Sequence, residues 1–254
     1  MSVSIKTARE IELMRESCRL LEYVHNELAK IVKPGISTWE IDHTGEEIIR
    51  IFGCTPNFLH YNGYPASICV SINDEVVHGI PSKKRFLQEG DIVSLDAGLI
   101  YKGYHSDAAR THAVGEISKE AEKLVQVTRE SFFEGIKFAK AGHHLHEISA
   151  AIGNYAQSFG YGVVRDLVGH GIGTSLHEDP QIPNFAQKRR GIKLVPGMTF
   201  AIEPMITMGR PDVAWLDDDW TVVTEDGSLS AHYENTILIT EGEPEILTLT
   251  KQEP

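Results

Sequence analysis

The chain has 254 residues, of which 24 are Lys or Arg and 36 are Asp or Glu, giving a formal net charge of -12. Such a surface repels a phosphate backbone, which argues against nucleic acid as a specific partner. The three cysteines are far apart in the sequence and suit free thiols in a reducing compartment. No apolar run approaches the roughly 18 residues of a membrane span, so we expect a cytoplasmic protein with no membrane segment.

Two helices followed by strands are predicted in the first half of the chain. Apolar residues recur every three or four positions from Ile11 to Ile31, which predicts a helix over about 7–32. Ser37 and Glu40 form a capping-box pattern that opens a second helix, ending near Phe52. Strand-like segments follow at 67–72, 91–100 and 104–114.

The same order of elements returns in the second half, with helices over about 118–140 and 146–159 and strands at 198–207 and 232–240. A single offset of 107 aligns eight pairs of positions: Lys33 and Lys140, Gly35 and Gly142, Glu40 and Glu147, Ile41 and Ile148, Phe52 and Phe159, Gly53 and Gly160, Gly90 and Gly197, Asp96 and Glu203. Asp107 and Glu234 correspond at an offset of 127, which leaves about twenty extra residues in the second half.

This pattern predicts an internal repeat within one domain over 1–254, with halves of about 7–115 and 116–245. We expect an α+β fold in which two halves, related by a pseudo-twofold axis, share one curved and mainly antiparallel sheet with helices outside. Equivalent residues of the two halves would then meet on the axis.

Four acidic residues occupy matched points of this repeat. Asp96 and Asp107 flank a segment whose Lys102 and Gly103 suit a hairpin turn. Pairing centred between residues 101 and 102 would place the two aspartates opposite each other, where they repel unless a cation lies between them. Glu203 and Glu234 form a second pair of acids at the matching positions of the second half. Any one acid alone would more simply be a surface residue, but their matched placement in apolar strands favours a common site.

His170 adds an imidazole nitrogen to these carboxylate oxygens, a donor set typical of a transition metal rather than calcium. Two divalent ions in such a site can activate a water for attack near neutral pH, so hydrolysis is the expected chemistry. The donor set leaves the metal open among Mn, Fe, Co and Zn, and a monovalent cation near the site is also left open. The glycines around His170 lack the spacing of a dinucleotide-binding loop.

Four segments resemble the motifs of type I methionine aminopeptidases: DAGLIYKGYHSDAART, LVGHGIGTSLHEDP, MTFAIEPMI and SAHYENTILIT. The resemblance covers essentially the whole chain. It implies the pita-bread fold and removal of the initiator methionine from nascent proteins, preferably before a small second residue. It also implies a set of metal ligands: Asp96, Asp107, His170, Glu203 and Glu234. Two alternatives of the same fold stay open, a proline-specific peptidase and a non-catalytic binding protein, although the former usually carries an additional amino-terminal domain.

The segment at 58–81 resembles the part of that family which lines the methionine pocket. The family pattern implies that four residues surround the methionine side chain: Tyr61, Tyr64, Cys69 and Trp220. It also implies that His78 and His177 contact the substrate. Our hypothesis for the mechanism is that Glu203 collects the proton of the nucleophile, His177 stabilises the tetrahedral intermediate and His78 contacts the scissile amide. Phe58 and Leu176 depart from the pattern, since a cysteine and a phenylalanine often stand there.

Three further clusters have simpler explanations. His143, His144 and His146 are expected to be a solvated helix start rather than a metal site. The basic run 188–190 is expected to be a solvated loop, with docking to a ribosome left open, and the acidic run 217–219 an exposed loop beside Trp220. The expected partners are nascent polypeptide N-termini, and the expected state is a monomer.

Overall fold

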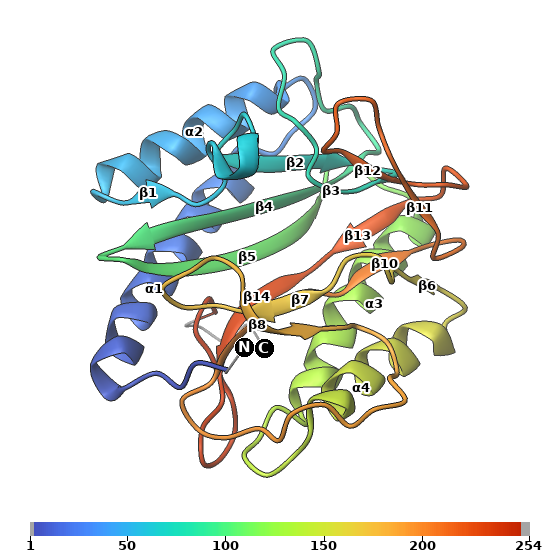
Figure 1. Ribbon diagram of the computed structural model, residues 1–254. Coiled ribbons are helices and arrows are strands. Elements are labelled where there is room, and N and C mark those ends of the chain that lie inside the picture. Colours follow the sequence, from blue (N-terminus) through green and yellow to red (C-terminus); the bar gives the residue numbers. More distant parts are fainter. Residues whose placement is uncertain (1–2, 250–254) are drawn as a thin grey trace.

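The structure is a computed structural model that describes residues 3–249. Two helix pairs lie against a central sheet (Figure 1): α1 (Ala8–Ile31) with α2 (Thr38–Ile51), and α3 (Lys119–Ile136) with α4 (Leu145–Ser158). The main sheet has nine strands, ordered β1-β4-β5-β14-β9-β7-β8, with β2 paired to β4 and β15 to β14. All its described pairs are antiparallel.

The strands of the main sheet come from both halves of the chain: β1 (Thr55–Pro56), β2 (Ile68–Ile72), β4 (Ile92–Tyr101), β5 (Tyr104–Ala113), β7 (Gly169–Gly171), β8 (Glu178–Ile182), β9 (Thr199–Ile202), β14 (Glu234–Leu238) and β15 (Glu245–Ile246). The two halves join where β5 pairs with β14. Two small sheets complete the fold, one of β13 (Ser230–His232), β10 (Met205–Thr207) and β6 (Gly162–Val163), the other of β11 (Val213–Trp215), β12 (Val222–Thr224) and β3 (Glu75–Val77).

The helices begin where the sequence predicts. The Ser37 hydroxyl caps α2 and the Glu40 carboxylate accepts from the Ser37 backbone N–H at 2.8 Å. At the matched point of the second half, the His144 backbone N–H donates to Glu147 at 2.7 Å, where α4 begins. The predicted correspondence of these helix starts is therefore confirmed, although α3 ends at Ile136 rather than near 140.

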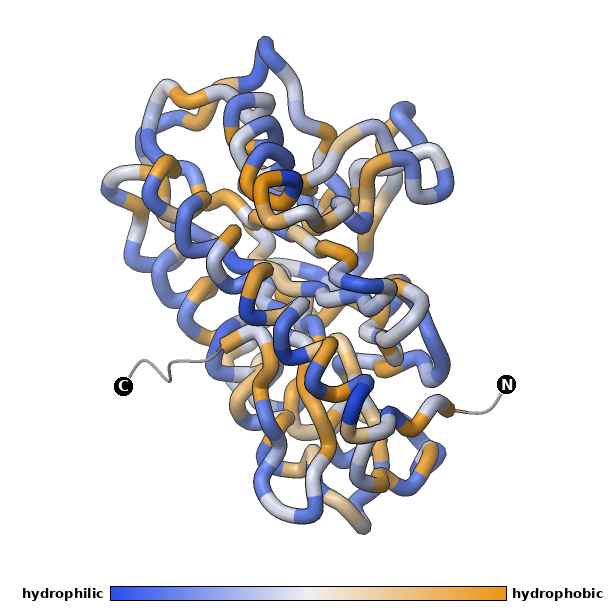
Figure 2. The backbone as a smooth tube through the Cα atoms, turned by 90° about the vertical axis from the view of Figure 1, so that its left-hand side faces the viewer, coloured by the Kyte–Doolittle hydropathy of each residue, from blue (hydrophilic) through white to orange (hydrophobic). Residues whose placement is uncertain are grey.

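Each helix pair buries an apolar face against its own part of the sheet. Leu21 and Leu28 of α1 pack with Ile68 and Leu95, and a second core forms around Phe132, Phe200, Ile148 and Ile237. Figure 2 shows hydrophilic and hydrophobic stretches alternating along the chain, as expected for elements with one buried side. No helix among the described residues is both long and apolar enough to cross a membrane.

The register predicted for the β4–β5 hairpin is wrong. Tyr101 pairs with Tyr104, so Asp96 lies opposite Ala109, and Asp107 lies opposite Gly98. The reason is a two-residue turn in which Lys102 and Gly103 both have positive φ, at 48° and 85°, as hairpin turns of this length require. Since the shift moves each partner by two residues, both aspartates still project from one face of the sheet.

The strand predicted over 198–207 is divided in two at Glu203 and Pro204. Proline has no N–H for a sheet ladder, so β9 ends at Ile202 and β10 enters a different sheet. Glu203 therefore lies at the exit of β9, directly beside the start of β14.

Candidate active site

The five predicted metal ligands come together on one face of the main sheet. Asp96 and Glu234 both lie opposite Ala109, one on each side of β5, and Glu203 follows the residue that pairs with Asn235. These three acids form one row across β4, β5, β14 and β9. The side chain between Asp96 and Glu234 in that row is a methyl group, which leaves space above the sheet.

A second row lies two residues along the strands, on the same face. Asp107 lies beside Thr236, whose hydroxyl donates to the Asp107 carbonyl at 2.8 Å. Thr236 pairs with Ala201, and Ala201 pairs with His170. Ligating atoms of Asp107, His170 and Glu234 all lie within 4.8 Å of one another. The two rows therefore bring all five side chains together, as predicted.

His170 presents its Nε2 atom to the carboxylates. Its Nδ1 lies 2.9 Å from the Gly171 carbonyl and donates to it, which leaves Nε2 with its lone pair. Nε2 is 3.7 Å from Asp107 Oδ2 and 3.6 Å from Glu203 Oε1. Burial lowers the pKa of His170 to about 3, so the ring is neutral and able to bind a metal ion.

Several carboxylate oxygens of the cluster are buried without a hydrogen-bond partner among the described residues. Among residues 3–249, the buried atoms Asp96 Oδ1, Asp107 Oδ1 and Glu234 Oε1 have no hydrogen-bond partner. Burial raises the pKa of Asp96 to about 7, and burial with the neighbouring acids raises the pKa values of Asp107 and Glu234 well above their usual range. Burying ionised carboxylates without partners is costly, so the cluster fits a bound divalent cation.

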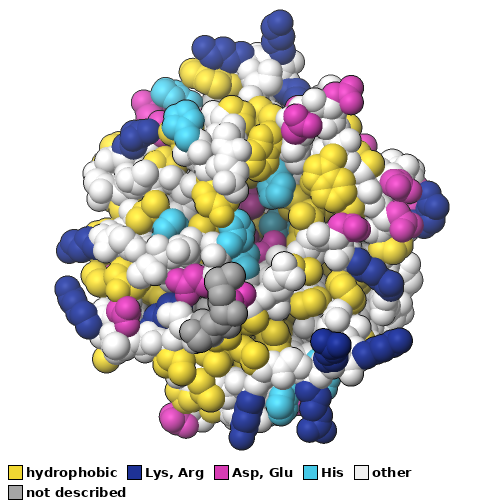
Figure 3. All heavy atoms as spheres, viewed as in Figure 1, with side chains coloured by type: hydrophobic (Ala, Val, Ile, Leu, Met, Phe, Trp, Pro, Cys, Tyr) yellow, Lys and Arg dark blue, Asp and Glu magenta, His cyan; other side chains and the backbone are white. Residues whose placement is uncertain are grey.

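An apolar pocket opens beside this cluster, and the two share one cavity of about 260 Å³. Figure 3 shows histidine and acidic side chains at the bottom of a hollow near the centre of this face, framed by hydrophobic side chains. The apolar lining contains the four predicted pocket residues and both residues that depart from the family pattern: Tyr61, Tyr64, Cys69, Trp220, Phe58 and Leu176. Tyr64 and Trp220 meet edge to face, with ring centroids 5.1 Å apart.

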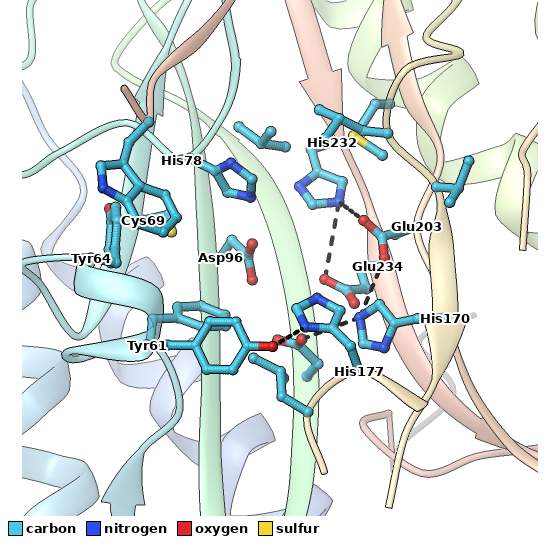
Figure 4. A pocket seen from close by; sticks show the side chains of 18 of the residues that line it. Tyr61, Tyr64, Cys69, His78, Asp96, His170, His177, Glu203, His232 and Glu234 are labelled. Carbon is cyan, nitrogen blue, oxygen red and sulfur yellow. Dashed lines mark hydrogen bonds and ion pairs between the residues drawn. The ribbon is translucent and has the colours of Figure 1, made fainter. Parts of the chain in front are cut away.

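Two further histidines, His78 and His177, lie beside the cluster in the same cavity, as Figure 4 shows. The His177 ring centroid is 4.3 Å from that of His170, and its Nδ1 lies 2.7 Å from the Tyr61 hydroxyl. His78 has a φ of 60°, which is uncommon for a residue with a side chain. Burial lowers the pKa of both rings, that of His78 to about 4, so both are neutral at pH 7.

His232 belongs to the same cavity but was not predicted. Its ring is buried, and Nε2 lies 3.9 Å from Glu203 Oε2 and 4.0 Å from Glu234 Oε2. Neither ring nitrogen has a hydrogen-bond partner among the described residues. Its spacing in the sequence could have predicted this position. His232 precedes Glu234 by two, and residues two apart on an extended chain point to the same side.

The other clusters lie outside this cavity. His144 and His146 direct Nδ1 to the carbonyls of Gly191 and Arg190, and no grouping of metal-ligating atoms forms there among residues 3–249. The acidic run 217–219 is exposed, as predicted. Asp218 in addition accepts from the Trp220 backbone N–H at 2.9 Å, so it shapes the turn that carries this pocket residue.

A buried carboxylate and histidine cluster at the end of an apolar pocket, on this fold, defines a metal-dependent hydrolase. The model of metallopeptidase family M24 matches residues 12–241, and the chain belongs to that family. It is 55% identical to a methionine aminopeptidase of Clostridium acetobutylicum, over 97% of this chain and 99% of the relative. It is 50% identical to methionine aminopeptidase 1 of Bacillus subtilis, over 96% and 98% of the two chains.

Solved structures agree. The crystal structure of a methionine aminopeptidase from Thermotoga maritima superposes with a TM-score of 0.95 at 45% identity, covering 97% of this chain and 99% of that one. An Xaa-Pro dipeptidase from Bacillus anthracis has a TM-score of 0.79 at 28% identity, and the match covers 98% of this chain but 63% of the dipeptidase. The resemblance to type I methionine aminopeptidases and the pita-bread fold are confirmed.

Proposed function

We infer that this chain is a metal-dependent aminopeptidase that removes the initiator methionine from nascent proteins, preferably when the second residue is small. The observation that carries this function is the continuity of the cavity, in which a pocket lined by aromatic rings and a thiol ends at the carboxylate and histidine cluster. A thioether packs well against aromatic edges and a thiol. Relatives that match over nearly their whole length are named methionine aminopeptidases.

We propose that the site holds two divalent ions, with Mn, Fe, Co and Zn as candidates. The support is the number of donors, since five side chains converge and three buried carboxylate oxygens lack partners among the described residues. The proposed ligands are those predicted from the sequence: Asp96, Asp107, His170, Glu203 and Glu234. When bound, the ions would polarise the scissile carbonyl and make a water nucleophilic near neutral pH.

The proposed role of His177 follows from its hydrogen bond to Tyr61, and that of His78 from its place in the cavity. If the Tyr61 hydroxyl donates to Nδ1 of His177, the proton of that ring is on Nε2, which can then donate to the oxygen that gains charge in the transition state. His78, buried at the other side of the cavity, contacts the scissile amide. Glu203 lies at the end of the cluster next to His170 and accepts the proton released by the attacking water.

The proposed methionine pocket is the apolar end of the cavity. Tyr64 donates its hydroxyl to the Gly79 carbonyl at 2.9 Å, so its ring edge and face remain for apolar contact. Cys69 and Trp220 complete the contact surface, while Phe58 and Leu176 bound the pocket. The amino group of the substrate then lies near the acids, which explains a preference for chain ends over internal bonds.

A proline-specific peptidase is the less favoured alternative. The Xaa-Pro dipeptidase, prolidase and X-Pro aminopeptidase structures are 22–28% identical to this chain, which covers 63–66% of their length. A non-catalytic binding protein is disfavoured because all five proposed ligands are present and face one point.

The test compares release of the first residue from Met-Ala-Ser, Met-Lys-Ser and Ala-Pro-Ser. Chelated protein and protein reconstituted with Mn, Co or Fe are assayed side by side. Cleavage of Met-Ala-Ser alone, and only with metal, is the expected result. Preferred cleavage of Ala-Pro-Ser would move the assignment to a proline-specific peptidase, and metal binding without cleavage of any peptide would move it to a binding protein.

We further propose that the protein acts as a monomer in the cytoplasm on nascent N-termini. All three cysteines are buried and free, which suits a reducing compartment. The run Lys188, Arg189 and Arg190 is exposed and offers a basic surface for a ribosome. Sedimentation with ribosomes, compared between the wild type and a variant with these three residues changed to Ser, tests that contact.

A further inference from the structure

A buried ion pair lies outside the cavity, next to the loop at 172–178 that carries His177. Lys6 Nζ donates to Glu178 Oε2 at 2.6 Å, and their side chains are 3% and 14% exposed. The lysines of the other Lys–Glu pairs within residues 3–249 are at least 32% exposed. Lys6 directly precedes the residue that caps α1, and Glu178 directly follows His177. The pair therefore joins the start of the chain to the segment that carries a proposed catalytic histidine.

The Lys6 side of the pair is fixed at two points. Its backbone N–H donates to the Gly197 carbonyl at 2.8 Å, just before β9. Its side chain then passes over Gly173, where an added Cβ would lie 2.5 Å from Lys6 Cε and 2.7 Å from Nζ. A side chain at 173 would displace the end of the lysine, so Lys6 and the loop at 172–178 fit together closely.

The Glu178 side of the pair holds the loop. Glu178 Oε1 accepts from the Ser175 backbone N–H at 3.3 Å and from the Thr174 hydroxyl at 3.5 Å, while Oε2 faces Lys6. The loop is also held from the first half, since the His105 backbone N–H donates to the Gly173 carbonyl at 2.8 Å. One carboxylate thus binds the lysine with one oxygen and the loop with the other.

We propose that Lys6 is a positioning residue for catalysis, acting through Glu178 to fix the orientation of the His177 ring. A buried ion pair contributes little net stability against an apolar pair of similar size, but it fixes its partners in one geometry. Here the fixed geometry is that of the loop that places Leu176 in the pocket and His177 beside His170. This inference rests on the proposed role of His177.

The test is a set of single and double variants assayed with metal-reconstituted protein on Met-Ala-Ser. Lys6→Met removes the charge and keeps the length of the side chain, while Glu178→Gln keeps the acceptor oxygen that faces Ser175 and Thr174. Each is measured alone and in a His177→Ala background, with bound metal quantified. Lys140→Met is the matched control, because Lys140 Nζ forms an exposed pair with Glu243 at the same distance of 2.6 Å.

We expect Lys6→Met and Glu178→Gln each to lower kcat about 10- to 100-fold with KM and metal content nearly unchanged, since misplacing a catalytic group by about 1 Å has effects of that order. The double variant should resemble either single variant. In the His177→Ala background both changes should have little further effect, because groups that act as a unit are non-additive. Lys140→Met should behave as wild type.

Other outcomes would overturn the inference. Wild-type kcat in Glu178→Gln, or an equal loss of kcat with and without His177, would show that the pair does not act through this ring. Wild-type kcat in His177→Ala alone would instead reject the role of His177, and an inactive wild type would reject the proposed function. Glu178→Gln keeps the test decisive if Lys6→Met fails to fold.

Discussion

Asp96 is a proposed metal ligand whose carboxyl group is buried. Burial raises its pKa to about 7 from a usual value of 3.8. An acid whose pKa is raised on folding binds more protons in the folded state than in the unfolded state between the two values. Its contribution to stability is therefore lost as the pH rises through that interval.

We predict that Asp96→Asn stabilises the metal-free protein relative to wild type, and more at pH 7.5 than at pH 4.5. A pKa shift of this size changes the free energy of unfolding by roughly 2–4 kcal/mol between the two pH values. Urea unfolding of chelated protein at both pH values measures it. Asp226→Asn is the control, because backbone hydrogen bonding from Arg210 lowers the pKa of exposed Asp226 to about 2, leaving that group ionised throughout the interval. A pH-independent difference for Asp96→Asn would contradict the prediction.

At the same scale, His78→Ala tests a histidine that is not placed among the metal ligands. We expect kcat to fall about 100- to 1000-fold, the usual effect of losing one hydrogen-bond donor to the transition state. Bound metal, measured by elemental analysis, should remain at the wild-type level. His43→Ala, on the exposed side of α2, is the control. Loss of metal together with activity would show that His78 supports the cluster rather than the substrate.

At the scale of elements, the β4–β5 turn sets which side chains become neighbours. Gly103 has a φ of 85°, a conformation that a residue with a Cβ adopts only with strain, although the surrounding space is open. We predict that Gly103→Ala destabilises the protein by about 1 kcal/mol. Gly242→Ala, also in open space but without a positive φ, should be neutral. Equal stability of both variants in urea unfolding would contradict the prediction.

The sequence predicts the elements better than their exact alignment. The apolar periodicity, the capping pattern at Ser37 and the repeat predicted the helices, the two-part sheet and the convergence of four carboxylates, to which His170 was added as a proposed fifth ligand. The hairpin register was missed because it depends on the φ angles of a two-residue turn. The division at Pro204 was missed because apolar residues continue on both sides of it, although proline itself interrupts a sheet ladder. Lys6 and Glu178 could not be paired, because they are 172 positions apart and neither is among the matched positions of the repeat.

At the scale of the whole molecule, the cluster draws its side chains from both halves of the chain. Asp96 and Asp107 come from the β4–β5 hairpin. His170 and Glu234 come from strands after residue 168, and Glu203 directly follows one of them. The halves meet at the β5–β14 pairing, which runs between these two sets. A cation bound there would tie the halves together and offset the repulsion between buried acids.

Removing the metal should therefore lower stability as well as activity. A ligand that binds only the folded state at 100 times its Kd adds about 2.7 kcal/mol, which for a chain of this size corresponds to roughly 5–10 °C in Tm. Calorimetry of chelated and Mn-reconstituted protein measures the difference. In His170→Ala the change in Tm on chelation should be smaller, because a nitrogen donor to the metal is lost. In His43→Ala the change in Tm should equal that of the wild type. An unchanged Tm on chelation, with the loss of bound metal verified, would mean that the acids are accommodated without a cation.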